Sequence, residues 1–120
     1  MNSEILERVR GLCLSFPGVT ERPSHGAPTF FINDKRTFTM FHDNHHGDGK
    51  LALWCAAEPG AQQALVTANP ECYFVPAYVG HRGWVGVRLD RSLEWEEVAE
   101  VLTDAYRAVA PAKLLAQLEG

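Results

Sequence analysis

The stretch that decides the fold reads Thr29-Phe30-Phe31-Ile32-Asn33-Asp34-Lys35-Arg36-Thr37-Phe38-Thr39-Met40-Phe41. Both halves of it are rich in aromatic and β-branched residues, which favour strands. Asn33-Asp34 separates the halves, and these two residue types tolerate the left-handed backbone of a two-residue hairpin turn. The stretch therefore predicts two antiparallel strands, 29–32 and 37–41, joined by a tight turn.

More strands are predicted on the C-terminal side of this hairpin. Residues 50–56 have the pattern of a third strand, and residues 84–89 show the clearest alternation along the chain. Residues 71–79 are rich in Tyr, Phe and Val but include Pro76, which cannot donate a backbone hydrogen bond. We therefore expect that segment to be an edge strand or an irregular one.

Helices are predicted at both ends of the chain. Residues 3–15 carry apolar side chains at helical spacing, and residues 93–110 form the longest helix, closed by a proline. A short helix is expected at 61–68 and an amphipathic tail at 114–118. Hairpin-linked strands with helices at both ends predict an α+β fold, a two-layer sandwich whose helices pack on one face of an antiparallel sheet.

The composition is typical of a single globular domain spanning residues 1–120. Hydrophobic residues make up 46% of the chain and charged residues 22%, which excludes the disordered and collagen-like classes. The chain begins without a basic and apolar leader, and no apolar run approaches the ~20 residues that cross a bilayer. The three cysteines are an odd number without a paired spacing. We therefore expect a cytoplasmic monomer that does not contact membranes.

The segment 19–28 lies between the first helix and the hairpin. Its proline and glycine residues predict a polar connector without regular structure. Glu21 and His25 are polar groups in this connector, and we expect them to overhang the sheet face that the helices leave open.

Alternation along the strands assigns each side chain to one face of the sheet. The apolar sets belong under the helices, and Phe38 and Met40 are among them. The opposite face, called the open face below, then carries two tryptophans, two cations and two threonines: Trp54, Trp84, Lys50, Arg88, Thr37 and Thr39.

This combination of side chains has three interpretations. Indoles beside cations can stack on bases and contact phosphates, so the first is weak DNA binding. The same residues can form the floor of a pocket for a small anionic or aromatic ligand, or contact a protein partner. In the third, Lys50 and Arg88 only shield the indoles through cation–π contacts.

The net charge of −4 disfavours tight binding to a polyanion. Residues 92–109, however, hold five acids against one base, so the acidity is expected on the side of the sheet that the helices cover.

The loop His42-Asp43-Asn44-His45-His46-Gly47-Asp48-Gly49 contains the residue types of a metal site. Its ligands are adjacent on a flexible loop, their spacing matches no zinc signature, and only His25 or His81 is available as a distant partner. We therefore expect a solvated loop without a metal. No candidate nucleophile lies in a recognisable catalytic signature either. The sequence favours a binding module without a cofactor over an enzyme.

Short motifs follow one another along almost the whole chain: Leu14-Ser15-Phe16-Pro17-Gly18-Val19-Thr20-Glu21, Gly26-Ala27-Pro28-Thr29-Phe30, Asn33-Asp34-Lys35 with Thr37-Phe38, Lys50-Leu51-Ala52-Leu53, Gly83-Trp84-Val85 and Ala105-Tyr106. In their order the chain resembles the MmcQ/YjbR family of small bacterial domains. The resemblance implies a two-layer α/β sandwich similar to bacterial frataxin. It also implies DNA binding, which is the function commonly given for the family.

Overall fold

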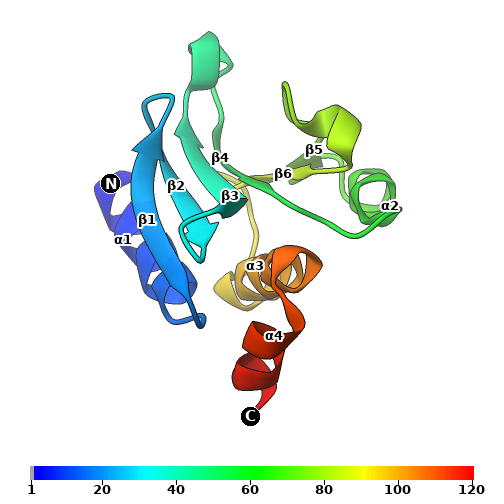
Figure 1. Ribbon diagram of the computed structural model, residues 1–120. Helices are drawn as coiled ribbons and strands as arrows, with labels where there is room; N and C mark the ends of the chain where they lie inside the picture. Colours follow the sequence, from blue (N-terminus) through cyan, green and yellow to red (C-terminus); the bar gives the residue numbers. More distant parts are fainter. Residues whose placement is uncertain (1) are drawn as a thin grey trace.

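The computed structural model of the chain describes residues 2–120. These residues form one six-stranded antiparallel sheet with the strand order β1-β2-β3-β4-β6-β5 (Figure 1). The strands are β1 (Val19–Ser24), β2 (Ala27–Ile32), β3 (Arg36–Asp43), β4 (Leu51–Cys55), β5 (Tyr73–Phe74) and β6 (Val85–Arg88). The helices are α1 (Asn2–Leu14), α2 (Ala61–Ala68), α3 (Trp95–Val109) and α4 (Ala112–Glu119), and two short 3-10 turns are η1 (His45–Gly47) and η2 (Gly80–Arg82).

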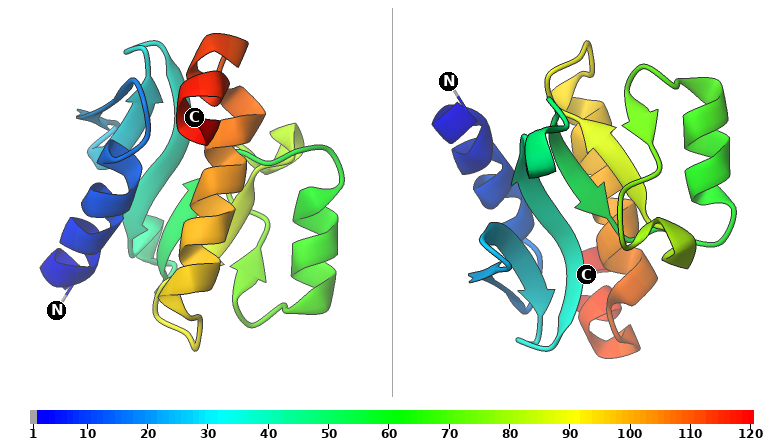
Figure 2. Two further views of the ribbon diagram at one scale, coloured as in Figure 1. Left: turned by 90° about the horizontal axis from the view of Figure 1, so that it is seen from below. Right: turned by 90° about the horizontal axis from the view of Figure 1, so that it is seen from above.

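Helices α1 and α3 cross one face of the sheet, and α2 lies beside the β5 edge (Figure 2). Across residues 2–120 no α-helix covers the opposite, open face. The predicted two-layer α+β sandwich is therefore confirmed, and the helix predicted at 61–68 has the observed bounds of α2. No helix within those same residues combines the length and the hydropathy of a membrane span.

Strand β1 occupies the segment expected to be an irregular connector, so that prediction was wrong. The strand pairs with β2 along its whole length, from Val19 opposite Ile32 to Ser24 opposite Ala27. Because β1 is an edge strand, one of its sides needs no partner, and proline is tolerated there. His25 and the glycine after it make the turn into β2 with φ angles of 51° and 80°, the left-handed pair that a type I′ hairpin requires.

The predicted hairpin between β2 and β3 is confirmed. Asn33 and Asp34 have φ angles of 55° and 58°, both in the left-handed region. The Lys35 N–H donates to the Ile32 carbonyl across the turn at 3.1 Å. The turn chemistry read from the sequence therefore fixes where the two strands meet.

Strand β3 contains a bulge that the sequence pattern did not predict. Phe30 pairs with Thr39 and the next residue of β2 pairs with Thr37, so Phe38 is the extra residue on β3. Phe38 and Thr39 consequently both face the helices. Thr39 is fully buried, and its hydroxyl lies 3.3 Å from the Cys55 sulfur. The placement of Thr39 on the open face was therefore wrong, and Met40, expected under the helices, lies on the open face opposite Trp54.

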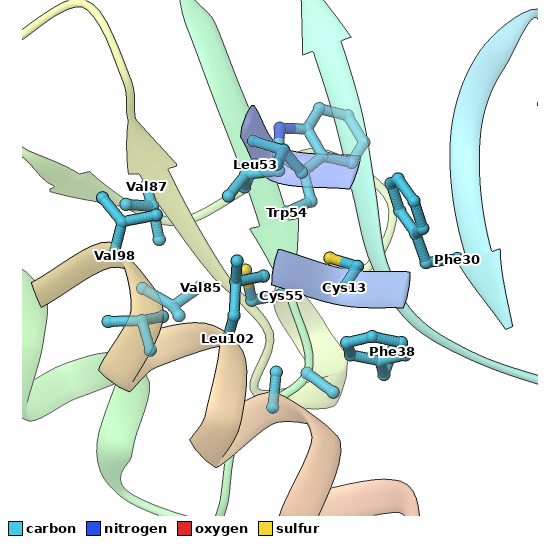
Figure 3. Close-up of a cluster of buried hydrophobic side chains, with 14 of the residues drawn as sticks. Cys13, Phe30, Phe38, Leu53, Trp54, Cys55, Val85, Val87, Val98 and Leu102 are labelled. Carbon is cyan, nitrogen blue, oxygen red and sulfur yellow. The ribbon is translucent and has the colours of Figure 1, made fainter. Parts of the chain in front are cut away.

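The hydrophobic core lies between the sheet and helices α1 and α3 (Figure 3). Cys13 enters it from α1, Leu53 from the sheet and Leu102 from α3. The ring of Tyr106 packs edge-on against Phe38 with a centroid distance of 5.7 Å. Its hydroxyl donates to the Pro17 carbonyl at 2.5 Å, which ties α3 to the turn after α1.

Candidate functional site

Trp54 lies on the open face and Trp84 directly precedes β6, but neither is exposed. Trp54 pairs with Gly86 across β4 and β6 and is 3% exposed, and Trp84 is 4% exposed. The guanidinium of Arg82 lies over the Trp84 ring, 5.3 Å from its centroid. Bases stack on aromatic rings whose faces are accessible. The two indoles therefore do not form the exposed stacking platform expected from the sequence.

The two predicted cations of the open face have partners within the chain. Arg88 donates two hydrogen bonds of 3.0 Å each to the Asp90 carboxylate. This pairing lowers the pKa of Asp90 and raises the pKa of Arg88. The Lys50 ammonium lies 5.1 Å from the centroid of the Phe74 ring. Neither cation has the cation–π contact with an indole that the shielding interpretation expected, because Arg88 pairs with Asp90 and Lys50 lies beside Phe74.

Glu21 lies on the covered face, so its expected position over the open face was wrong. It pairs with Phe30, and its carboxylate accepts two hydrogen bonds from Arg10 of α1, at 2.8 and 3.0 Å. The cause is the formation of β1, which fixes the face of every residue in the segment. His25 has the expected place: it lies in the turn after β1, at the edge of a cavity on the open face.

This cavity has a volume of about 580 Å³ and brings four histidines together around one indole. We call it the histidine pocket. It is lined by side chains from the β1–β2 turn, β3, the η1 turn, β4 and the segment before η2: Ser24, His25, Met40, His42, His45, His46, Trp54, Tyr78 and Val79. The loop expected to be solvated therefore folds back over the sheet and covers Trp54.

The rings of the pocket are in close contact with one another. The His42 ring stacks on Trp54 with a centroid distance of 3.9 Å, and His45 meets the same indole edge-on at 4.7 Å. His45 also lies 4.8 Å from His42 and 5.8 Å from Tyr78. The pocket wall is thus aromatic on several sides, which suits a flat ligand that can stack or meet ring edges.

Polar ring atoms in this cluster are buried without a partner. Among residues 2–120, the buried side-chain nitrogen and oxygen atoms that have no hydrogen bond are His42 Nε2, His45 Nε2 and Trp54 Nε1. All of them belong to pocket-lining rings. A buried polar group left without a hydrogen bond costs about 1–3 kcal/mol. The cluster therefore carries a hydrogen-bonding capacity that the fold itself does not use.

His42 is a neutral imidazole at pH 7. Burial and, to a smaller extent, the charge of His45 lower its pKa from the ordinary 6.5 to about 4, and Asp48 opposes this shift. A neutral imidazole has one donor and one acceptor nitrogen. Within the described part of the chain, no group of three or more His, Cys, Asp and Glu side chains is arranged to hold a metal ion.

Backbone strain gathers at the same place. His25, His46 and Tyr78 have positive φ angles of 51°, 47° and 65°. Histidine adopts this left-handed region more often than most residues do, so the clear strain is at Tyr78. The other non-glycine residues of chain positions 2–120 with positive φ are Asn or Asp, which tolerate it. Strained bulky residues persist where surrounding structure holds them, and they are frequent at binding sites. All three line the histidine pocket.

The sequence contained one signal for this pocket, the density of histidines between positions 42 and 46 together with His25. The strand pattern also offered Tyr73 or Tyr78 for the edge of the open face, and of these two Tyr78 lines the pocket, with a left-handed backbone that the sequence did not predict. It also could not show that Met40 faces this side, because that depends on the bulge at Phe38.

Comparisons with known proteins agree with this architecture. A family model described as YjbR matches residues 14–108. Among solved structures, the chain is similar to the crystal structure of the Deinococcus radiodurans protein DR2400, which has a DUF419 domain. The TM-score is 0.75 at 20% identity, and the likeness covers 95% of this chain and 87% of that one. At this identity the similarity shows the fold alone. A search of curated proteins gives no match.

Proposed function

The chain belongs to the YjbR family, and we propose that it is a binding module that holds a flat aromatic ligand in the histidine pocket. The observation that carries this proposal is the set of buried ring nitrogens without partners, on His42, His45 and Trp54. A ligand that supplies hydrogen bonds to these atoms would remove the cost of burying them without partners. Among the described residues, no other buried side-chain nitrogen or oxygen lacks a hydrogen bond.

The chemistry of the rings defines the class of ligand. Trp54 Nε1 can only donate a hydrogen bond, so the ligand needs an acceptor such as a carboxylate or a carbonyl oxygen. The stacked and edge-on rings around Trp54 favour a planar aromatic body. The cavity volume of about 580 Å³ lies within the range of small-molecule sites, roughly 300–1,000 Å³.

The test is calorimetric titration with 1-naphthoate, a planar aromatic carboxylate, beside cyclohexanecarboxylate, which has the same charge and no aromatic face. We expect measurable binding of the first compound only. Trp54→Phe keeps an aromatic ring and removes the Nε1–H, so affinity for naphthoate should fall by about fivefold, the worth of one hydrogen bond. The matched control is Trp95→Phe, which makes the same substitution outside the histidine pocket, on α3, where Arg8 lies over the Trp95 ring.

Two results would overturn the proposal. Equal affinity for the two carboxylates would show that the aromatic walls contribute nothing. Equal affinity of the Trp54→Phe and Trp95→Phe proteins for naphthoate would place any binding outside the histidine pocket.

Weak DNA binding by the open face is the second candidate function. The observation that favours it is the separation of charge: α3 carries exposed acids such as Glu96, Glu100 and Asp104 on the covered side, and Lys50 lies on the other side. With Trp54 and Trp84 buried, such binding would depend on phosphate contacts and would weaken steeply with salt.

Fluorescence anisotropy of labelled single- and double-stranded DNA tests this candidate, at low and at physiological salt. Micromolar affinity that falls with salt and with Lys50→Ala would support it. No binding at low salt would remove it. Lys50 lines a cavity that adjoins the histidine pocket at Trp54, so naphthoate is also titrated into the Lys50→Ala protein to separate the two candidates.

A further inference from the structure

A second cavity on the molecule differs from the histidine pocket in its chemistry. It is a groove of about 470 Å³ at the end of the sheet where β3 begins, β4 has ended and the last turn of α3 passes. Its lining residues are Lys35, Arg36, Thr37, Ala56, Ala57, Arg82, Trp84, Ala108 and Val109. We call it the cationic groove. Trp84 is buried and its Arg82 neighbour exposed, so the indole lies at the base and the guanidinium at the edge.

The charge of this groove is unbalanced. Lys35, Arg36 and Arg82 line it, and among the described residues no acid does. None of these three cations forms an ion pair with any residue in positions 2–120, whereas five other arginines of the chain do. The last turn of α3 contributes about half a negative charge through its carbonyl groups. Against three full positive charges, the groove remains strongly positive in a chain whose net charge is −4.

This arrangement suits a phosphate group. Guanidinium groups bind phosphate oxygens in pairs through fixed forks of N–H donors, and lysine adds a point charge. Thr37 supplies a hydroxyl that can donate to a further oxygen. A phosphate monoester carries close to two negative charges at pH 7, which matches three cations better than a single carboxylate does.

We propose that the cationic groove binds the terminal phosphate of a small phosphate monoester. The site is separate from the histidine pocket, since the two cavities share no lining residue. It uses neither Lys50 nor Arg88, the cations on which DNA binding by the open face was predicted. The phosphodiester of a nucleic acid backbone also presents phosphate oxygens, but it carries one negative charge less than a monoester. The experiment therefore tests a monoester and a nucleic acid strand separately.

The probes are inorganic phosphate, adenosine 5′-monophosphate and a ten-residue oligothymidylate without terminal phosphates, titrated by calorimetry at constant ionic strength. We expect phosphate and the monophosphate to bind. Arg36→Gln and Arg82→Gln should each weaken both by about tenfold, since a hydrogen-bonded charge contact is lost. Arg36 is exposed, so Arg36→Gln should keep the urea unfolding midpoint of the parent protein, whereas Arg82→Gln also loses the contact with Trp84 and should lower the midpoint slightly.

The matched control is Arg8→Gln, which removes the same charge. Arg8 lies over Trp95 at the start of α3, about 20 Å along that helix from Ala108. If Arg8→Gln weakened phosphate binding as much as the groove variants do, the loss would come from net charge alone, and the proposal would be overturned. So would an absence of phosphate and monophosphate binding. Oligothymidylate binding that is lost in the two groove variants, without monophosphate binding, would assign the groove to a nucleic acid backbone and overturn the monoester assignment.

Trp54→Phe separates this inference from the proposed function. It should leave the affinity for adenosine 5′-monophosphate unchanged, and Arg82→Gln should leave the affinity for naphthoate unchanged. If Trp54→Phe weakened monophosphate binding as strongly as Arg82→Gln does, the phosphate would lie in the histidine pocket and the groove assignment would be wrong.

Discussion

The imidazole of His42 stacks on the indole of Trp54, with their ring centroids 3.9 Å apart and their planes inclined by 38°. The stack forms where β3 runs beside β4, and both residues face the side of the sheet away from the long helices. Because it is partly buried, the imidazole stays neutral at pH values where a free histidine is charged. The burial of this imidazole therefore makes the stability of the fold depend on pH.

The first prediction concerns that dependence. The pKa of His42 is lowered from 6.5 to about 4 in the folded chain, so between these values the unfolded chain binds a proton that the folded chain does not. Stability should therefore fall as the pH drops from 6.5 towards 4, and this contribution should be constant above 6.5. The urea unfolding midpoint at pH 7.5 and at pH 5 measures it. His42→Gln should show a smaller difference between the two midpoints than the parent protein, and the exposed His81→Gln should not.

The second prediction tests the bulge at Phe38. Thr37 and Thr39 would share a face in a regular strand, but Thr39 is fully buried and Thr37 lines the cationic groove. Thr39→Glu should cost about 3–5 kcal/mol of stability, because it places an unpaired charge in the core. Thr37→Glu should change stability by no more than about 1 kcal/mol, since cations surround that position. Chemical unfolding of both variants measures this, and similar losses in the two would mean that the bulge is absent.

The same bulge explains the limit of reading faces from the sequence. Alternation along 85–88 and 51–55 assigned the residues of β6 and β4 to the correct faces, because both strands are regular. On β3 the assignment failed beyond Phe38, since one extra residue reverses the pattern for all that follow. Strand β1 was hidden for a different reason: its proline, Pro23, is a signal against a strand, and the position of β1 at the sheet edge makes that proline tolerable.

The histidine pocket could be predicted only in part for a similar reason. Trp54 and His25 were placed on the open side by pattern alone. The contact of His45 with Trp54 depends on how the loop after β3 turns back, and that turn uses left-handed residues such as His46 that no residue preference predicts. The groove cations were not singled out either, because Lys35 and Arg36 read as ordinary polar residues of a hairpin turn.

The third prediction contrasts two glycines. A Cβ atom on Gly86 would lie 2.3 Å from the Phe74 ring, which packs over β6 at that point. Gly11, inside α1, has no other atom within 4 Å of such a Cβ and has an ordinary helical φ. Gly86→Ala should therefore cost about 1–3 kcal/mol through overpacking, whereas Gly11→Ala should stabilise the protein by about 0.5–1 kcal/mol. Thermal unfolding of the two variants compares them, and a stabilised Gly86→Ala protein would show that Phe74 does not cover β6.

The last prediction concerns Arg88, whose Nε and Nη2 both donate to Asp90, so that the carboxylate neutralises the charge of the guanidinium. If DNA contacts the open face, Asp90→Asn should raise the affinity for labelled DNA several-fold at low salt, because it releases a charge that the native pair neutralises. The matched control is Glu119→Gln, which changes net charge equally and frees Arg107 from its ion pair on the helical side. An equal gain in both variants would report long-range charge alone, because Arg107 lies away from the open face. A gain confined to Asp90→Asn would place the DNA beside β6, where Arg88 and Arg91 both lose the negative charge of their shared partner.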